Sequence, residues 1–381
     1  MKKFLTVLLI VAMIFTFASC GKGGETPQGG ETPQGGDAPQ SGTSYADIPD
    51  TVESADGTYA IAMVTDVGQL KDGSFNENTW NGCKKYAADN GLTYKYYQPA
   101  NGDKATDADR IKAMTDACEA GAKALVTPGF LQETALKEVA PKYPEVQFVF
   151  VDGWDLGFDN LVGVSYQEEQ AGYLAGYAVV MNGLTKLGFS GGGGGANPAC
   201  VRYGYGFVQG ANDAAKVKGT KVEMRYSWEY GSTFSASTEL QAMLSGWYEA
   251  GTEVVFVCGG SMFNSGTAAA DAADGKIVGV DVDQSVLSDT VVTSACKGLD
   301  TSVITVLTKY FKEGALIKGA MVLGAKDNAV QLPEATWSLE NWSVDEYKAL
   351  FEKIQKGEVA IDNEQVSDPS TKGFENVTFI K

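Results

Sequence analysis

The segment DVGQLKDGSFN, at residues 66–76, gathers side chains that could hold a small molecule. It follows an apolar, strand-like run at residues 59–64 and leads into a helix-like stretch. Polar groups at the carboxyl end of a strand are how an open α/β sheet presents a binding site. Here the ring of Phe75 stands beside the carboxylate of Asp66 and the amide of Asn76, which suits an aromatic ring that carries a sugar.

A second polar group ends another apolar run, in the sequence VGVDVDQ at residues 278–284. Paired acids of this kind raise three possibilities: a glycosidase dyad, a divalent-metal site, or an acceptor for a sugar diol. We expect Asp281 and Asp283 to point away from each other, so that they make a poor two-carboxylate site. We therefore favour sugar binding by one of them and expect no metal site. An ordinary acid at a strand end is the alternative.

Two glycine-rich turns also follow strand-like runs. The run GGGGG at residues 191–195 invites a phosphate-binding interpretation, but neither GK[ST] nor a clean GxGxxG with an acidic partner accompanies it. We predict a sharp strand-to-helix turn there, with a close backbone approach to a neighbour or a neutral ligand. Gly259 and Gly260, directly after the run at residues 253–258, could expose backbone amides to a ligand, although a plain tight turn uses the same residues.

Phe234 lies just after another strand-like run, at residues 222–226, much as Phe75 follows the first one. One aromatic ring from each half of the chain would sandwich a flat ligand, whereas the alternative places both rings in the hydrophobic core. The residues alone leave these two interpretations open.

The composition excludes several classes of function. Thirty Lys and Arg against 48 Asp and Glu give a formal net charge of −18, which argues against nucleic acid as a partner because it needs a basic patch. The chain has no His, so the usual general base and the commonest soft-metal ligand are missing. We expect no catalysis and no cofactor. The cysteines after Cys20 have no paired spacing and are interpreted as small buried hydrophobes: Cys83, Cys118, Cys200, Cys258 and Cys296.

The N-terminus is typical of a bacterial lipoprotein. Two lysines precede a short apolar run and then the sequence FASCG, so residues 1–19 are predicted to be a signal peptide. A lipidated Cys20 would become the mature N-terminus; an uncleaved anchor helix is the alternative. Residues 20–56 contain ETPQGG twice and almost no large apolar residue, which predicts a flexible tether.

The remaining body is too long for one ordinary core and suits two lobes. Strand-like and helix-like stretches alternate, which predicts an α/β fold with parallel sheets. We expect strands at residues 59–64, 124–127, 146–151, 186–190, 222–226, 253–258 and 276–280. We expect helices from a Ser74 cap to residues 90–91 and at residues 107–120, 167–181, 236–250, 265–273, 299–313 and 344–356. Residues 57–163 with 291–320 are assigned to an N-terminal lobe, and residues 164–290 with 321–381 to a C-terminal lobe, with the cleft between them.

Several short motifs follow one another along this body. They are the segment at residues 66–76, VDG at 151–153, QAGYLAG at 170–176, GYGFVQG at 204–210, VFVCGG at 255–260, GVDVDQ at 279–284 and TSACK at 293–297. Together they resemble the basic membrane protein family of substrate-binding lipoproteins, which includes the purine nucleoside receptor of spirochaetes. A set of motifs in order is far more specific than any one of them.

The resemblance implies a type I periplasmic-binding fold, in which two Rossmann-like lobes joined by three crossovers close on a ligand like a hinge. Carried over to this sequence, Phe75 and Phe234 would stack on the base, while Asp66 and Asn76 would line the wall of the first lobe. Asp152, which follows a strand of the first lobe, is a further ligand-binding candidate.

By the same resemblance, Asp281, Lys297 and the backbone amides around Gly259 and Gly260 would take the ribose hydroxyls. Asp281 can accept both hydroxyls of a cis-diol, and Lys297 would hold that carboxylate while donating to a ring or hydroxyl oxygen. An ordinary ion pair is the alternative for Lys297.

These expectations describe a lipid-anchored monomer on the extracytoplasmic face of the cell membrane. It would capture a nucleoside, in the first place a purine nucleoside, and pass it to the permease of an ABC importer. The main alternative is another sugar-like ligand, such as a pentose or a signal molecule. A nucleoside hydrolase using Asp66, Asp281 and Asp283 is a weaker alternative, because His is missing and the acids are separated.

Overall fold

The computed structural model describes residues 44–67 and 69–380. The predicted signal peptide, Cys20 and most of the predicted tether lie outside these residues. The chain from Thr43 to Lys381 forms one compact unit, which contains both of the lobes discussed below. Within the described ranges, no helix is long and apolar enough to cross a membrane.

The expected end of the tether at residue 56 is wrong, because the chain already packs onto the body some ten residues earlier. Ile48 is only 5% exposed. The ammonium group of the buried Lys84 donates to the carbonyl oxygen of Ile48 at 3.2 Å and to the Asp50 carboxylate at 3.1 Å. Ile48 and Val52 pack against the core, and further hydrogen bonds join Tyr45 to Asp300 and Tyr94 to the carbonyl oxygen of Pro49. So few apolar residues leave the composition of the segment polar, which is why it was assigned to the tether.

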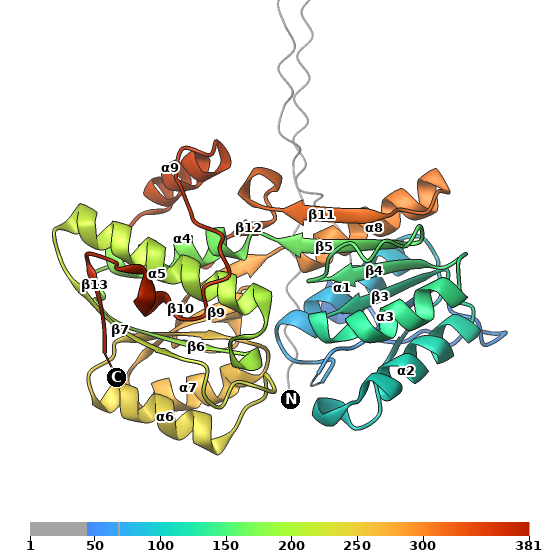
Figure 1. Ribbon diagram of the computed structural model, residues 1–381, viewed down its shortest axis with the longest axis horizontal. Helices are drawn as coiled ribbons and strands as arrows, with labels where there is room; N and C mark the ends of the chain where they lie inside the picture. Colours follow the sequence, from blue (N-terminus) through green and yellow to red (C-terminus); the bar gives the residue numbers. More distant parts are fainter. Residues whose placement is uncertain (1–43, 68, 381) are drawn as a thin grey trace, which may run out of the picture. The chain divides into compact units, whose positions relative to one another are not determined.

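The first sheet is entirely parallel and has the strand order β11-β5-β4-β3-β1-β2 (Figure 1). Its strands are β1 (Ile61–Val64), β2 (Tyr94–Tyr97), β3 (Ala124–Pro128), β4 (Gln147–Val151), β5 (Leu161–Tyr166) and β11 (Gly319–Leu323). The helices packed with it are α1 (Phe75–Asp89), α2 (Asp107–Glu119), α3 (Glu133–Val139) and α8 (Leu299–Glu313). Successive residues of β1 belong to different cores, Met63 to the one containing α1 and α8 and Val64 to the one containing α2 and α3. The sheet is therefore covered on both faces, as its continuous hydrophobicity predicts.

The second sheet has the order β12-β10-β9-β8-β6-β7-β13, and β12 is its one antiparallel strand among the described residues. Its strands are β6 (Lys186–Gly191), β7 (Val222–Ser227), β8 (Val254–Cys258), β9 (Lys276–Asp281), β10 (Val291–Lys297), β12 (Val330–Gln331) and β13 (Val377–Phe379). Its helices are α4 (Glu168–Met181), α5 (Pro198–Lys218), α6 (Thr238–Glu249), α7 (Met262–Ala273) and α9 (Val344–Gln355). The predicted α/β fold with parallel sheets is confirmed.

The chain passes between the two sheets three times: from β5 to α4, from β10 to α8, and from β11 to β12 (Figure 1). The crossing segments lie side by side, since the backbone N–H of Gln167 donates to the carbonyl oxygen of Leu323 at 2.8 Å. One predicted lobe boundary is wrong here. Residues 291–297 form β10 of the second sheet, because this strand pairs directly with β9, and the chain crosses only after Lys297.

Two of the sequence motifs hold helices together. A Cβ atom at Gly172 of α4 would lie 2.1 Å from the carbonyl oxygen of Tyr203, and one at Gly210 of α5 would lie 2.0 Å from that of Tyr173. Only glycine permits so close an approach of two helix backbones. Glycine also lowers helix propensity. For this reason the glycine-containing sequence of α5 was not expected to form a helix at residues 198–218.

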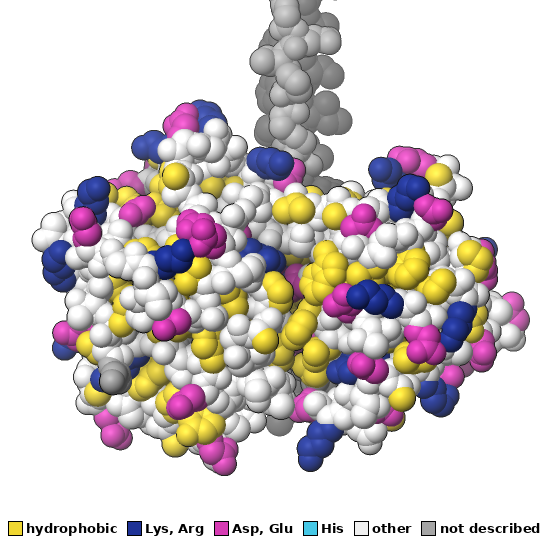
Figure 2. All heavy atoms as spheres, in the orientation of Figure 1, with side chains coloured by type: hydrophobic (Ala, Val, Ile, Leu, Met, Phe, Trp, Pro, Cys, Tyr) yellow, Lys and Arg dark blue, Asp and Glu magenta, His cyan; other side chains and the backbone are white. Residues whose placement is uncertain are grey.

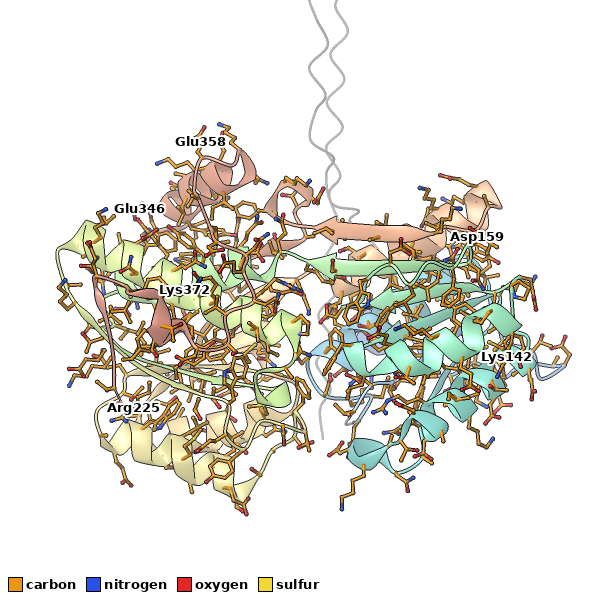
Figure 3. The ribbon with its side chains drawn as sticks, in the orientation of Figure 1. Lys142, Asp159, Arg225, Glu346, Glu358 and Lys372 are labelled. Carbon is orange, nitrogen blue, oxygen red and sulfur yellow. The ribbon has the colours of Figure 1, made fainter. Side chains whose placement is uncertain are left out.

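The charged surface is mixed in sign. On the face shown in Figure 2, acidic and basic side chains of the described residues alternate rather than gather into one basic area. Of the charged side chains labelled in Figure 3, Lys142, Asp159 and Lys372 form ion pairs at the outside of the body. Such pairs contribute little to stability.

Candidate functional site

One cavity between the two lobes brings the predicted site residues together. Together with its opening to solvent, it holds about 580 Å³ of empty space. All nine predicted ligand-binding residues line it: Asp66, Phe75, Asn76, Asp152, Phe234, Gly259, Gly260, Asp281 and Lys297. Most of them lie at or just after the carboxyl end of a parallel strand, where such sheets present their sites.

Asn76 and Asp72 build the wall of the first lobe. The Asn76 side-chain oxygen accepts from the backbone N–H of Asp66 at 2.9 Å, and its amide group donates to Val67 O at 3.2 Å. The carboxylate of Asp72 accepts the backbone N–H groups of Asn76 at 2.9 Å and Glu77 at 3.1 Å, which are free at the start of α1.

The predicted helix cap at Ser74 is therefore wrong in its chemistry. Ser74 stands at the N-cap position of α1 but its side chain makes no cap hydrogen bond. The Asp72 carboxylate occupies that role, and the Ser74 hydroxyl donates instead to Asp281 Oδ2 in the other lobe at 2.6 Å.

Asp66 is a buried acid with an unused oxygen. Its Oδ1 atom has no hydrogen-bond partner among the described residues. Burial raises the pKa of Asp66 to about 7, although the backbone N–H of Val67 and the charge of Arg110 oppose that rise. A Cβ atom at Gly129 would lie 2.1 Å from Asp66 Oδ2, so the glycine makes room for this side chain.

Lys297 lies at the centre of a buried charged cluster with Asp152, Asp281 and Glu168, which we call the cavity floor. Its Nζ atom donates to Asp152 Oδ2 at 2.6 Å and lies 3.6 Å from carboxylate oxygens of both Asp281 and Glu168. Burial alone would lower the pKa of Lys297, but these three carboxylates raise it overall. Burial raises the pKa of Asp152 to about 6 against the opposing charge of Lys297. The expected ion pair with Asp281 is present, but the short hydrogen bond goes to Asp152.

Asp152 and Asp281 occupy matching positions in the two lobes. Asp152 follows β4, Asp281 ends β9, and both have left-handed backbone conformations with φ of 54° and 67°. Such conformations are uncommon outside glycine and are often found at functional sites. Asp283 does not line this cavity; it accepts the hydroxyl of Thr336 at 2.6 Å and the backbone N–H of Ser285 at 3.1 Å. The two acids are separated as expected. The separation arises because β9 ends at Asp281, which has a left-handed backbone, and Asp283 lies beyond the strand; alternate residues of one regular strand would share a face.

Phe75 and Phe234 line the cavity from the first and the second lobe, and both are half-buried. The Lys297 ammonium group lies 4.9 Å from the centroid of the Phe75 ring. A Cβ atom at Gly192 would lie 2.3 Å from the Phe234 ring. The glycine run at residues 191–195 thus makes the expected close approach, and the neighbour is an aromatic ring.

Residues at the start of α5 also line the cavity, which was not expected from the sequence. Asn197, Cys200 and Tyr203, in its cap and first turns, also line the cavity, as do Gln69 and Ser261. The Asn197 side chain caps α5 by accepting the backbone N–H of Cys200 at 3.0 Å. Asn-Pro directly after the glycine run is a helix-start signal that could have indicated this helix. In the part of the chain that the structure describes, no three acidic, Cys or His side chains are placed to hold a metal ion.

Comparison with known sequences gives consistent matches. Residues 60–365 match the protein family described as "ABC transporter substrate-binding protein PnrA-like". The chain is 26% identical over 307 residues to the "ABC transporter nucleoside-binding protein BmpA" of Lactococcus lactis subsp. cremoris, covering 74% of this chain and 80% of that protein. It is 26% identical over 325 residues to basic membrane protein B of Borreliella burgdorferi, covering 81% and 89%. It is 29% identical over 242 residues to the CD4+ T-cell-stimulating antigen of Listeria innocua, of which the match spans only 63%, and 59% of this chain.

Solved structures share the fold. A solute-binding protein of an ABC transporter system from Aeropyrum pernix K1 superposes with a TM-score of 0.67 at 22% identity, covering 80% of this chain and 94% of that one. The lac repressor bound to operator superposes with a TM-score of 0.50 at 14% identity, covering 72% and 92%. At such identities the likeness shows the fold alone, and it confirms the type I periplasmic-binding fold.

Proposed function

This chain belongs to the PnrA-like family of ABC transporter substrate-binding proteins, and from that premise we propose that it captures a nucleoside, in the first place a purine nucleoside, for an ABC importer. The family consists of binding proteins and not of enzymes. The Lactococcus relative is named as a nucleoside-binding protein, which supports this class of ligand.

The proposal is carried by one observation: Phe75 and Phe234 line the same cavity from opposite lobes. Two aromatic rings facing one cavity suit a flat, uncharged base between them. Stacking of a base on an aromatic ring is worth about 1–3 kcal/mol and does not need a charged ligand.

The floor of the cavity suits the sugar of a nucleoside. Asp281 and Asp152 offer carboxylate oxygens, and Lys297 between them offers an ammonium group. Vicinal hydroxyls donate well to a carboxylate, and the ammonium group can donate to a hydroxyl or ring oxygen. Asp281 in this role would accept the cis-diol, with Lys297 and Gly259 beside it.

Hydrogen bonds between the lobes support binding by hinge closure. Ser74 donates to Asp281 at 2.6 Å, Gln284 donates to the carbonyl oxygen of Gly73 at 3.1 Å, and Ser235 donates to Asp103 at 2.7 Å. Each pair joins the first lobe to the second. Contacts that exist only in the closed form are the ones that a ligand can stabilise by binding there.

We further propose that this receptor lies outside the cytoplasmic membrane, because its N-terminal sequence is typical of a lipoprotein signal. A lipid on Cys20 would tether the body, as a monomer, near the permease that receives the ligand. Replacing Cys20 with Ser should abolish metabolic labelling by palmitate and release the protein from the membrane fraction. Retention of both in the variant would contradict the anchor.

Thermal unfolding with candidate ligands tests the proposed function. A ligand at a hundred times its Kd adds about 2.7 kcal/mol to the free energy of unfolding, which gives a visible shift. We expect purine nucleosides to raise the unfolding temperature of the purified protein, and free bases and ribose to have little effect. Stabilisation by a pentose and not by nucleosides would instead select the sugar-like ligand.

A further inference from the structure

Tyr203 presents a buried hydroxyl group that no described residue uses. The residue lies on α5, lines the cavity and is 1% exposed. Its hydroxyl has no hydrogen-bond partner within residues 44–67 and 69–380. Leaving a buried polar group unpaired is costly, so native structures pair nearly all of them with protein, water or ligand.

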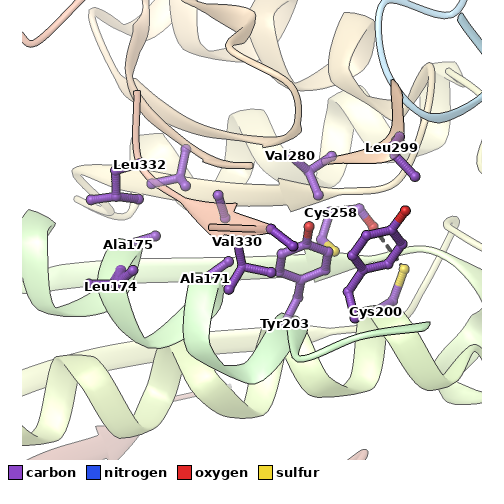
Figure 4. Packing of buried hydrophobic residues seen from close by; sticks show 14 of the residues in the cluster. Ala171, Leu174, Ala175, Cys200, Tyr203, Cys258, Val280, Leu299, Val330 and Leu332 are labelled. Carbon is purple, nitrogen blue, oxygen red and sulfur yellow. Dashed lines mark hydrogen bonds between the residues drawn. The ribbon is translucent and has the colours of Figure 1, made fainter. Parts of the chain in front are cut away.

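The surroundings of Tyr203 belong to the cavity floor. The Lys297 Nζ atom lies 5.6 Å from the centroid of the Tyr203 ring. Figure 4 draws Tyr203 among Cys200, Cys258 and Val280, which line the same cavity. Burial, reinforced by the nearby carboxylates, raises the pKa of Tyr203 well above its ordinary value, so its hydroxyl stays protonated and remains a donor.

A second unused atom lies on the same floor. Asp152 Oδ2 accepts the hydrogen bond from Lys297, but Asp152 Oδ1 has no partner among the described residues. The cavity floor therefore offers an unused donor from the second lobe and an unused acceptor from the first, in addition to the unused Asp66 Oδ1 in the cavity wall. A ligand hydroxyl can accept from a phenol and donate to a carboxylate at once, whereas a carbonyl oxygen only accepts and an ammonium group only donates.

We propose that Tyr203 is a specificity-determining residue whose hydroxyl binds a hydroxyl group of the ligand's sugar. This rests on the proposed function and deepens it, because Tyr203 would read a hydroxyl in addition to the diol assigned to Asp281. A sugar hydroxyl held between Tyr203 and the carboxylates of the floor would join both lobes, and so would favour the closed form.

The test combines one variant with a series of ligands. Tyr203→Phe removes only the hydroxyl, and we expect it to weaken the binding of a ribonucleoside about three- to tenfold in calorimetric titration. The binding of 2′-deoxy, 3′-deoxy and 5′-deoxy nucleosides is then compared between both proteins. One of these ligands, lacking the hydroxyl that Tyr203 contacts, should bind the variant and the wild type equally well. Unchanged affinity for every ligand, or the same loss with every ligand, would overturn the proposal.

A matched control separates this role from a structural one. Tyr205→Phe makes the same change on the same helix, but the Tyr205 hydroxyl donates to Asp362 at 2.8 Å, and this residue does not line the cavity. It should leave all affinities unchanged. Unfolding of the free protein gives a second readout: because the Tyr203 hydroxyl is unpaired, Tyr203→Phe should be at least as stable as the wild type, and a clear loss of stability would indicate a structural partner instead.

Failure of the proposed function is recognised separately. If the wild type binds a pentose and no nucleoside, the nucleoside assignment fails. The affinities of deoxy-pentoses for the wild type and Tyr203→Phe then still show whether Tyr203 binds a sugar hydroxyl. If the wild type binds neither class of ligand, both proposals are overturned.

Discussion

The ammonium group of Lys297 lies 2.6 Å from the carboxylate of Asp152, and this ion pair joins the ends of strands in two different sheets. Both side chains are buried, at 2% and 9% exposure. Lys297 stands directly before one of the crossovers, so it links the hinge region, the cavity floor and the opposite lobe. A ligand that contacts Lys297 or Asp152 therefore contacts a group that depends on how the lobes are placed.

Replacing Lys297 with Met should destabilise the free protein strongly. The change leaves three carboxylates, of Asp152, Asp281 and Glu168, without their shared cation. Breaking a buried ion pair by removing one partner costs about 3–5 kcal/mol, and urea unfolding measures the difference. Lys318→Met removes an exposed ion pair with Asp159 and should leave stability unchanged. Equal stability of the two variants would mean that the cluster contributes nothing.

Asp281→Asn should weaken nucleoside binding without unfolding the protein. Asn tolerates the left-handed backbone at this position, so the change removes charge rather than straining the chain. Hydrogen bonds to a charged group are worth about 1.5–3 kcal/mol, so we expect Kd to rise about 10- to 100-fold. Asp283→Asn, two residues further and outside the cavity, is the control. Unchanged affinity in Asp281→Asn would contradict the assignment of the diol.

Why could the sequence predict the residues of this site so well? Asp66, Asp152 and Asp281 each lie at or just after a strand, and the carboxyl ends of parallel strands meet at one edge of a sheet. Strand positions are readable from apolar runs, which favoured Asp66 and Asp281, whereas the resemblance to the family indicated Asp152. Tyr203 has no such marker, because it lies on a helix and reaches the cavity only through the packing of α5 against the second sheet.

The hydrogen-bond partners of the site residues were less predictable than the identity of those residues. Lys297 was expected to hold Asp281, but its short hydrogen bond goes to Asp152, 145 residues away in the chain. The choice depends on the relative placement of the lobes, which no local pattern contains. Similarly, Ser74 matches a helix cap by type, yet the Asp72 carboxylate accepts three backbone N–H groups, and the Ser74 hydroxyl donates to Asp281 instead.

The stability of the protein should depend on Asp66 in a defined pH range. Its pKa is raised from 3.8 to about 7 by burial, so the folded state binds the proton more tightly than the unfolded state. The stability contributed by the protonated acid is complete below about pH 4 and is lost as the pH rises through 7. In Asp66→Asn, which stays neutral, that loss is absent.

The comparison of both proteins in urea at pH 5 and pH 8 measures this effect. Relative to the wild type, Asp66→Asn should gain about 3 kcal/mol between the two pH values, because about two pH units separate pH 5 from the folded-state pKa and each corresponds to about 1.4 kcal/mol. A variant whose stability relative to the wild type falls toward pH 8 would show that Asp66 is charged and well paired in the folded protein.

Phe75→Ala should weaken the binding of the base but not the binding of the sugar. If the ring stacks on the base, the variant loses about 1–3 kcal/mol of nucleoside binding, a rise in Kd of about 5- to 150-fold. The weak binding of free ribose, which has no base, should change little, and so serves as an internal control. Equal losses for ribose and nucleoside would indicate that Phe75 supports the cavity as a core residue, consistent with its contact with Lys297.

Gly192→Ala should impair binding through Phe234. The backbone of Gly192, with φ of −78°, accepts any L-residue, so the substitution brings no backbone strain. Its methyl group would lie 2.3 Å from the Phe234 ring and must push that ring out of place. We therefore expect the affinity for nucleoside to fall nearly as far as in Phe234→Ala, about 5- to 150-fold if the ring stacks on the base. Gly246→Ala, with open space around its Cβ position, is the control that should bind normally.

The double variant decides whether the effect passes through the ring. In Phe234→Ala the space beside Gly192 is empty, so adding Gly192→Ala there should weaken binding no further, and the two single losses should not add. Losses that do add would mean that Gly192 approaches the ligand itself, through its backbone. Because neither change touches a charged group, the comparison is free of the electrostatic coupling that links the residues around Lys297, and it measures the placement of one aromatic ring.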